Sequence, residues 1–158
     1  MIQSNSTLTG NIDVIGIGNA IVDILVNVED TFLEKYSLIK GSMTLINQTQ
    51  AQNFYAEINE GLQASGGSAA NTITGISQLG GIAGFIGKVG NDELGISFKK
   101  DIEKVGAIYN TPSAEDGPST ARCMIFVTPD AQRTMCTYLG VSVLIKTTEL
   151  DLGLIENS

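Results

Sequence analysis

The chain has 158 residues, which is enough for one domain with a substantial core, and its 42% hydrophobic and 16% charged residues are typical of a globular protein. The 17 acidic residues outnumber the 9 basic ones and give a net charge of −8. This charge argues against nucleic acid or an anionic membrane surface as a partner, because both require a basic face on the protein.

The sequence carries no signal for secretion or membrane insertion. Residues 1–11 lack the charged and then apolar pattern of a signal peptide, and we expect them to be a loose leader. No apolar run approaches the length of a transmembrane helix. We therefore expect a cytoplasmic protein.

The residue types present limit the chemistry. The chain contains no histidine, which excludes Ser-His-Asp and Cys-His catalysis and the common zinc sites, and we predict no metal site. Cys123 and Cys136 are too few for a disulfide scaffold and lie in apolar segments. We expect both to be reduced packing residues.

The first 60 residues predict three strands and a helix. Residues 12–17 form a short apolar run that is typical of a buried parallel strand. Residues 21–28 alternate in the manner of a strand with one apolar face, which places Asp23 on the other face. A further short strand is predicted at 42–46, and an amphipathic helix at 49–60.

The stretch Gly66-Gly67-Ser68-Ala69-Ala70-Asn71 marks the start of the next helix, predicted over 68–79 and ended by Gly80. Two adjacent glycines allow backbone angles with φ > 0 just before the helix N-terminus, where unpaired N–H groups point outward. Asn71 lies in the first turn, and its amide can both donate and accept hydrogen bonds. That combination suits a hydroxyl-rich ligand, although an isolated Gly-Gly-Ser is more often a simple turn.

The remaining residues predict further strands and helices. In chain order these are a strand at 82–86, a helix at 92–105 capped by Asp92, a short strand at 107–109, strands at 122–128 and 133–139 joined by a hairpin turn, and a last helix capped by Thr147 or Thr148. The strand–helix alternation predicts a parallel sheet with covering helices. The segments at 21–28, 42–46, 122–128 and 133–139 predict a smaller, mostly β layer.

The glycine stretch, continued by Gly80 and Gly90, resembles the first signature of the PfkB-type carbohydrate kinase family. Its Gly-Gly-Ser-x-x-Asn form is most similar to the adenosine-kinase branch, and the run from Gly18 to Asp23 resembles the opening of that branch's members. Ile73 departs from the family pattern, which usually has Ser, Thr or Ala at that position.

The resemblance implies a fold and a site. The implied fold is α/β and ribokinase-like, with a Rossmann-like three-layer α/β/α core and a small β-sheet lid, of which residues 12–158 would be the N-terminal part. The implied sugar-binding residues are Asn19, Asp23, Gly66, Gly67, Ser68 and Asn71. The glycine pair would act as a hinge for lid closure, which excludes water from phosphoryl transfer.

The implied activity is ATP-dependent phosphoryl transfer to a ribose-type hydroxyl, with the 5′-OH of adenosine as the expected acceptor. ATP and Mg²⁺ are the cofactors expected for the complete enzyme, and a homodimer could form through the lid. The second family signature, whose Gly-Ala-Gly-Asp core supplies the general base and the anion hole, does not occur in these 158 residues. We therefore expect a truncated chain that holds the substrate-binding half, with no catalytic or cofactor-binding residue assigned and no activity by itself.

Other interpretations remain. Arg133 is expected to contact the phosphate side of the closed cleft, with a solvent-facing hairpin arginine as the alternative. The chain could also be a non-catalytic remnant that binds a nucleoside or sugar or associates with other proteins. A nicotinamide enzyme is disfavoured, because Ile21 stands where the dinucleotide fingerprint begun by Gly16 and Gly18 requires a third glycine.

Overall fold

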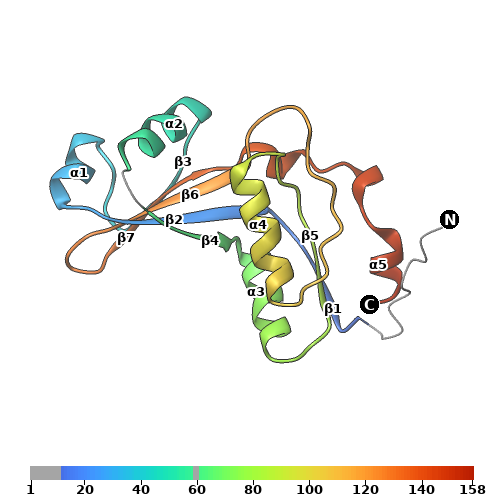
Figure 1. Ribbon diagram of the computed structural model, residues 1–158. Helices are drawn as coiled ribbons and strands as arrows, with labels where there is room; N and C mark the ends of the chain where they lie inside the picture. The colour runs from blue at the N-terminus through green and yellow to red at the C-terminus, as the bar shows by residue number, and fades with distance from the viewer. Residues whose placement is uncertain (1–11, 59–60) are drawn as a thin grey trace.

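The computed structural model describes residues 12–58 and 61–158, which form two sheets with helices packed on them (Figure 1). In the first sheet, here called the core sheet, β1 (Val14–Ile17) and β5 (Ala83–Ile86) pair in parallel. Ile108 extends this sheet by a parallel bridge to Gly84, with Phe85 N donating to the Ile108 carbonyl at 2.9 Å.

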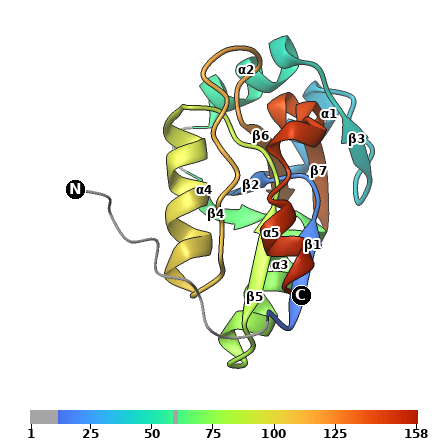
Figure 2. The same ribbon diagram turned by 90° about the vertical axis from the view of Figure 1, so that its right-hand side faces the viewer.

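Helices cover both faces of the core sheet. Helices α3 (Ser68–Gln78) and α4 (Glu93–Lys104) lie on one side, and the short α5 (Leu152–Glu156) lies on the other (Figures 1 and 2). Successive side chains of β5 point to opposite faces of the sheet, which explains this arrangement. Phe85 packs with residues of α3 and α4, whereas Ile86 packs with Leu154 of α5. The result is a three-layer α/β/α arrangement.

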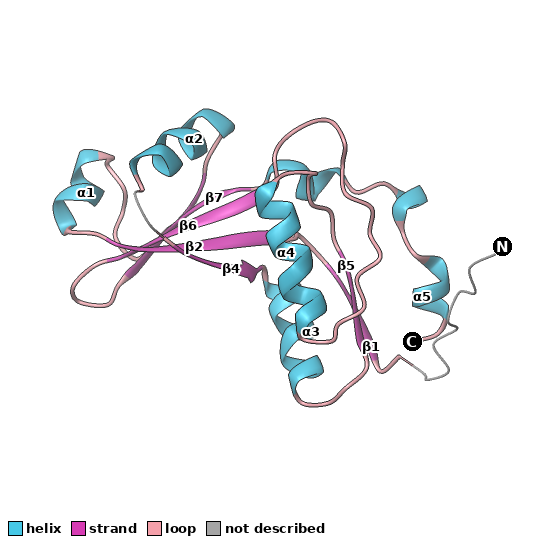
Figure 3. Ribbon diagram, in the orientation of Figure 1, coloured by secondary structure: helices cyan, strands magenta, loops and turns pink. Residues whose placement is uncertain are grey.

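The second sheet has five strands in the order β3-β7-β6-β2-β4 and extends away from the core sheet (Figure 3). Its strands are β2 (Ile21–Asn27), β3 (Met43–Leu45), β4 (Leu62–Gly66), β6 (Ala121–Val127) and β7 (Arg133–Tyr138). β6 pairs in parallel with β2 and antiparallel with β7, through the hairpin turn that the sequence predicts. The four segments expected to form the mostly β layer therefore lie in one sheet.

Helices α1 (Asp30–Lys35) and α2 (Gln48–Glu57) cover the outer part of one face of the second sheet (Figure 1). Their packing rests on an aromatic cluster, in which the Phe32 and Phe126 ring centroids are 4.8 Å apart and those of Phe54 and Phe126 are 5.5 Å apart. The opposite face carries exposed apolar side chains, including Met43, Leu45 and Leu62. One face of this sheet is therefore covered by helices, and the other is open.

The helix ends follow the local sequence. Asn47 caps α2 through a capping box with Gln50, and Asp92 caps α4 by accepting from Gly95 N at 2.9 Å. Gly80 ends α3 with φ of 92°, as expected of a glycine after a helix C-terminus. Within the described residues, no helix is long and apolar enough to span a membrane.

Several sequence predictions are corrected. Helix α1 and strand β4 were not predicted. The last helix does not begin at Thr147 or Thr148, because Thr147–Glu149 form a 3₁₀ turn and α5 is capped by Asp151, which accepts from Leu154 N at 2.9 Å. Another 3₁₀ turn covers Gly140–Leu144.

Of the other predictions, one is corrected in part, one is confirmed and two fall on residues that the structure does not describe. The strand predicted at 107–109 is reduced to the single bridge of Ile108. Cys123 and Cys136 are both buried free thiols, as predicted. The predicted leader at 1–11 lies outside the described residues, as do residues 59–60 at the end of the helix expected over 49–60.

Candidate functional site

Asp23 lies on β2 close to the core sheet, in a row with Ala64 of β4 and Cys123 of β6. The neighbouring Val22 and Ile24 point to the other face and are buried, so the alternation predicted from the sequence is confirmed. Asp23 itself is half-buried, and this burial raises the pKa of its carboxyl. A partly desolvated carboxylate binds a hydroxyl donor more strongly than a fully hydrated one does.

Strand β4 brings the glycine pair to Asp23. Gly66 lies opposite Ile21 in the ladder, and a Cβ atom added to Gly66 would overlap the Asp23 carboxylate, with Oδ1 at 2.7 Å. Only glycine therefore leaves room for the carboxylate in this position.

Gly67 connects β4 to α3 and contacts the loop before β2. Its φ is 96°, and an added Cβ would lie 2.5 Å from the carbonyl oxygen of Asn19. The Gly67 carbonyl accepts from Asn71 N at 2.8 Å in the first turn of α3. A glycine is thus required here both by the backbone angle and by the close approach of Asn19.

The first turn of α3 is open to a ligand. Its N-cap residue is Gly67, which has no side-chain acceptor, so the first N–H groups of the helix remain to be satisfied by water or a ligand. Ser68 and Asn71 are both exposed on this turn, and Asn19 is exposed in the loop that Gly67 contacts. The structure therefore places Asn19, Asp23, Gly66, Gly67, Ser68 and Asn71 around the junction of β2, β4 and α3.

This junction offers both kinds of hydrogen-bonding group. The carboxylate can accept from two neighbouring hydroxyls, the amides of Asn19 and Asn71 can donate or accept, and the helix N–H groups donate. Such a set matches a vicinal diol better than it matches an apolar ligand or a cation.

Arg133 is not part of this group. It is exposed at the start of β7, opposite Val127 and next to the hairpin turn. Arg133 shares a sheet face with Thr137, which lies in the same row of the sheet as Asp23 and Cys123. Arg133, however, lies four residues before Thr137 on β7. That separation is about 13 Å along the strand.

Two further features were missed from the sequence. Thr137 Oγ1 donates to Cys123 Sγ at 3.2 Å and so joins the row of Asp23. Lys88, which follows β5 at the carboxyl end of the core sheet, is only 6% exposed and forms an ion pair with Glu149. In the sequence, the position of Lys88 in a glycine-rich loop directly after a strand could have indicated that this lysine is buried at the end of the core sheet.

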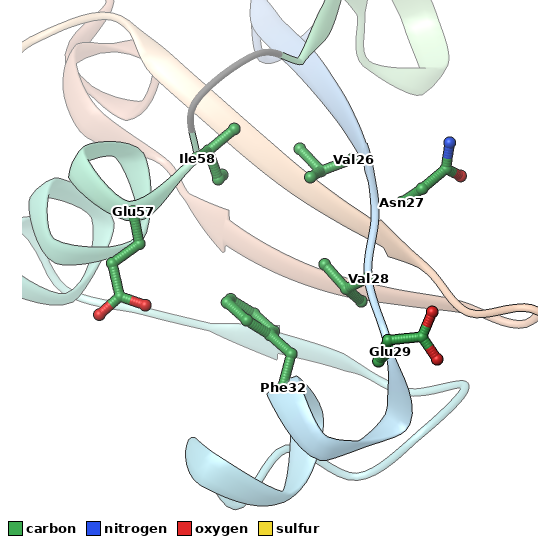
Figure 4. Close-up of a pocket in the computed structure, with 7 residues that line it drawn as sticks. All are labelled: Val26, Asn27, Val28, Glu29, Phe32, Glu57 and Ile58. Carbon is green, nitrogen blue, oxygen red and sulfur yellow. The ribbon is translucent and has the colours of Figure 1, made fainter.

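The described residues do not form a metal site, since no group of three or more Cys, Asp or Glu side chains among them is arranged to hold an ion. A cavity of about 530 Å³ lies elsewhere, between the far end of β2 and helices α1 and α2 (Figure 4). Val26, Val28, Phe32 and Ile58 line it with Asn27, Glu29 and Glu57. Glu57 there is paired with Lys35 at 3.0 Å, and the cavity is not lined by the residues around Asp23.

Residues 34–158 match the family described as pfkB family carbohydrate kinase. The chain is 32% identical to the probable fructokinase-3 of Arabidopsis thaliana over 99 residues, which cover 61% of this chain and 29% of that protein. It is 34% identical over 104 residues to the probable fructokinase-2 of the same plant, covering 61% of this chain and 30% of that protein.

Among solved structures, the adenosine kinase from Sinorhizobium meliloti has 44% identity and a TM-score of 0.85, over 92% of this chain and 45% of that one. The probable sugar kinase from Rhizobium etli CFN 42 has 41% identity and a TM-score of 0.86, over 93% and 44% of the two chains. The chain thus spans less than half of the length of each of these proteins.

Proposed function

Because the chain belongs to the pfkB family of carbohydrate kinases, we propose that it forms the acceptor-binding part of an ATP-dependent sugar or nucleoside kinase, with adenosine as the acceptor. Its fold is ribokinase-like and truncated relative to the solved structures it matches. The proposal concerns the substrate and the residues that bind it.

The observation that carries the proposal is the half-buried Asp23 carboxylate beside the glycine pair at the start of α3. Asp23 accepts hydrogen bonds from the two ribose hydroxyls, and Asn19 and Asn71 donate to or accept from the same sugar. Gly66 leaves room for the Asp23 carboxylate and Gly67 for the Asn19 carbonyl, and the exposed Ser68 lies in the first turn of α3 beside the bound sugar.

The second sheet acts as the lid in this proposal. Its open face carries Asp23 near the core and Arg133 near the hairpin, with apolar side chains such as Leu25, Ile125 and Met135 between them. Closure of this face over the acceptor would exclude water, and it would bring Arg133 toward the phosphate. A homodimer would form through the same open face. Substrate and a second copy of the chain would therefore compete for this face.

Adenosine is preferred over a hexose because the identity to an adenosine kinase is 44%, whereas the plant fructokinases are 30–34% identical. Fructose is the second candidate, since the alignments with two probable fructokinases cover 61% of this chain. ATP follows from family membership as the phosphoryl donor. The described residues offer no cluster for Mg²⁺, so no residue of this chain is assigned to that ion.

The proposal is tested by calorimetric titration of the chain with adenosine, 2′-deoxyadenosine and fructose. The parent should bind adenosine and discriminate against the deoxy ligand. Asp23→Asn should lose roughly ten- to a hundredfold in adenosine affinity, and most of the discrimination, because a hydroxyl loses its charged partner. Asp116→Asn is the matched control, since it removes the same charge from an exposed loop position.

Three results would contradict the proposal in different ways. If fructose binds and adenosine does not, the site is retained but the acceptor is a hexose. If Asp23→Asn binds both nucleosides as the parent does, Asp23 is a surface charge and the site assignment fails. Binding of adenosine without phosphoryl transfer in a version of the protein of family length would favour a non-catalytic binding protein.

A further inference from the structure

Arg122 is a buried cation on the side of the second sheet opposite to Asp23. It precedes Cys123 on β6, and successive strand residues point to opposite faces, so Arg122 points away from the face that carries Asp23. Only 8% of Arg122 is exposed. A buried guanidinium requires compensation by acceptors or by negative charge, because it has lost its hydration.

The surroundings of Arg122 supply that compensation only in part. Its guanidinium carbon lies 5.1 Å from the ring centroid of Tyr55 and 5.8 Å from that of Tyr138. Among residues 12–58 and 61–158, Nε of Arg122 has no hydrogen-bond partner, and no carboxylate forms an ion pair with it. The two rings attract the positive charge of Arg122, but they do not supply a carboxylate that could accept hydrogen bonds from its N–H groups.

Asp92 is the carboxylate whose charge acts on Arg122, and its two oxygen atoms already accept three hydrogen bonds. Oδ1 accepts from Gly95 N at 2.9 Å and from Thr120 Oγ1 at 2.6 Å, and Oδ2 accepts from Thr120 N at 2.8 Å. Asp92 therefore caps α4 and holds the start of β6, and among the described residues it forms no ion pair with Arg122.

A cavity of about 230 Å³ lies at this point, where α2, the beginning of α4 and β6 meet. Its lining residues are Tyr55, Asp92, Glu93, Leu94, Ser119 and Arg122. The cavity thus combines a guanidinium with the ring of Tyr55 and the side chain of Leu94, which form apolar walls. It also adjoins the N-terminus of the 12-residue helix α4, which the Asp92 carboxylate caps.

We propose that this cavity is a binding site for a small organic carboxylate, held by Arg122 at the junction of α2 and α4. The carboxylate accepts two N–H bonds from the guanidinium, and its short apolar end packs against Leu94 and Tyr55. A monoanion suits the site better than a phosphate dianion, because Asp92 and Glu93 already place negative charge beside it. The site is separate from the acceptor site around Asp23, so neither proposal depends on the other.

Tyrosine fluorescence provides the direct test, because the chain has four tyrosines and no tryptophan, and two of the tyrosines flank Arg122. The chain is titrated with sodium butyrate against sodium chloride of the same ionic strength. A saturable change in emission is expected with butyrate only. Arg122→Met should weaken butyrate binding by roughly ten- to a hundredfold, because it removes a charge-assisted pair. Lys100→Met, which removes an exposed positive charge from α4, should leave the affinity unchanged.

Thermal melting of the parent gives a second readout that does not depend on a variant folding. Butyrate should raise the melting temperature in a saturable way, because a ligand that binds only the folded state stabilises it. The proposal is overturned if chloride reproduces the butyrate response, or if inorganic phosphate saturates the site and butyrate does not. It is also overturned if a folded Arg122→Met binds butyrate as the parent does.

Discussion

Gly66 and the carboxylate of Asp23 are in direct contact across the β2–β4 ladder, at a distance that leaves no space for a side chain on Gly66. The contact means that the shape of β4 and the position of the carboxylate are fixed together. A change at Gly66 is therefore expected to act through Asp23 and not through β4 alone.

The first prediction is that Gly66→Ala lowers adenosine affinity by an amount similar to Asp23→Asn, because the new methyl group displaces the carboxylate. Gly66→Ala should also lower the free energy of unfolding of the parent. In an Asp23→Ala background the same substitution should lower it much less, because most of the overlap with the carboxylate is gone. The coupling between the two sites should be about 0.5–3 kcal/mol, measured by urea unfolding of the four proteins of the cycle. An equal cost of Gly66→Ala in both backgrounds would contradict the assigned contact.

The second prediction concerns Gly67, where backbone angle and close packing act together. Gly67→Ala should destabilise the protein by about 1–3 kcal/mol, because φ is 96° and the added Cβ would lie 2.5 Å from the Asn19 carbonyl. Gly106→Ala is the matched control, since Gly106 has φ of 85° but open space around the added atom. The difference between the two variants in urea unfolding isolates the contact with Asn19. Equal losses would show that only the backbone angle matters.

The third prediction follows from the raised pKa of Asp23, which is caused by burial. The folded protein holds this proton more strongly than the unfolded chain does, so the stabilisation by protonation is complete below the unfolded pKa. It is lost as the pH rises through the higher folded pKa. Asp23→Asn should therefore melt at a higher temperature than the parent at pH 7, and the difference should shrink when the pH falls below about 4. A lower melting temperature for Asp23→Asn at pH 7 would contradict this.

The sequence predicted those features that depend on neighbouring residues. The alternation around Asp23, the helix start after Gly67 and the cap at Asp92 are local, and all three are found in the structure. Strand β4 was missed because most of its side chains are exposed, and its strand character comes from pairing with β2. The grouping of Asp23 with Gly66 and Gly67, which lie more than 40 residues later, came from the family resemblance and not from local pattern.

Two further features show this limit. Helix α1 has only six residues and is stabilised by packing of Leu33 and Phe32 on the second sheet, which no local pattern reveals. Arg122 occupies a strand position whose burial depends on Tyr55, 67 residues earlier in the chain, and on the N-terminus of α4. Its environment follows from the assembled fold and not from the residues beside it.

The fourth prediction concerns Asp92, which ties the start of α4 to the start of β6. Burial alone would raise the pKa of Asp92, but the hydrogen bonds from Thr120 and Gly95 outweigh it and lower the pKa overall. The ionised carboxylate therefore stabilises the fold above its unfolded pKa, and this contribution is lost as the pH falls through the lower folded pKa. Asp92→Ala removes the helix cap and leaves two donors of Thr120 unpaired. It should cost about 1–3 kcal/mol at pH 7.

Urea unfolding at pH 7 and at a pH below the folded pKa of Asp92 measures this contribution, with circular dichroism as the signal. Asp92→Asn keeps one acceptor oxygen, so it should lose less stability than Asp92→Ala at pH 7. The difference between the parent and Asp92→Asn should narrow at the lower pH, where the parent carboxyl is also uncharged. Asp116→Asn, at an exposed loop position, should match the parent at both pH values. If the stability lost by Asp92→Asn is the same at both pH values, the charge of Asp92 does not contribute and the cap acts through geometry alone.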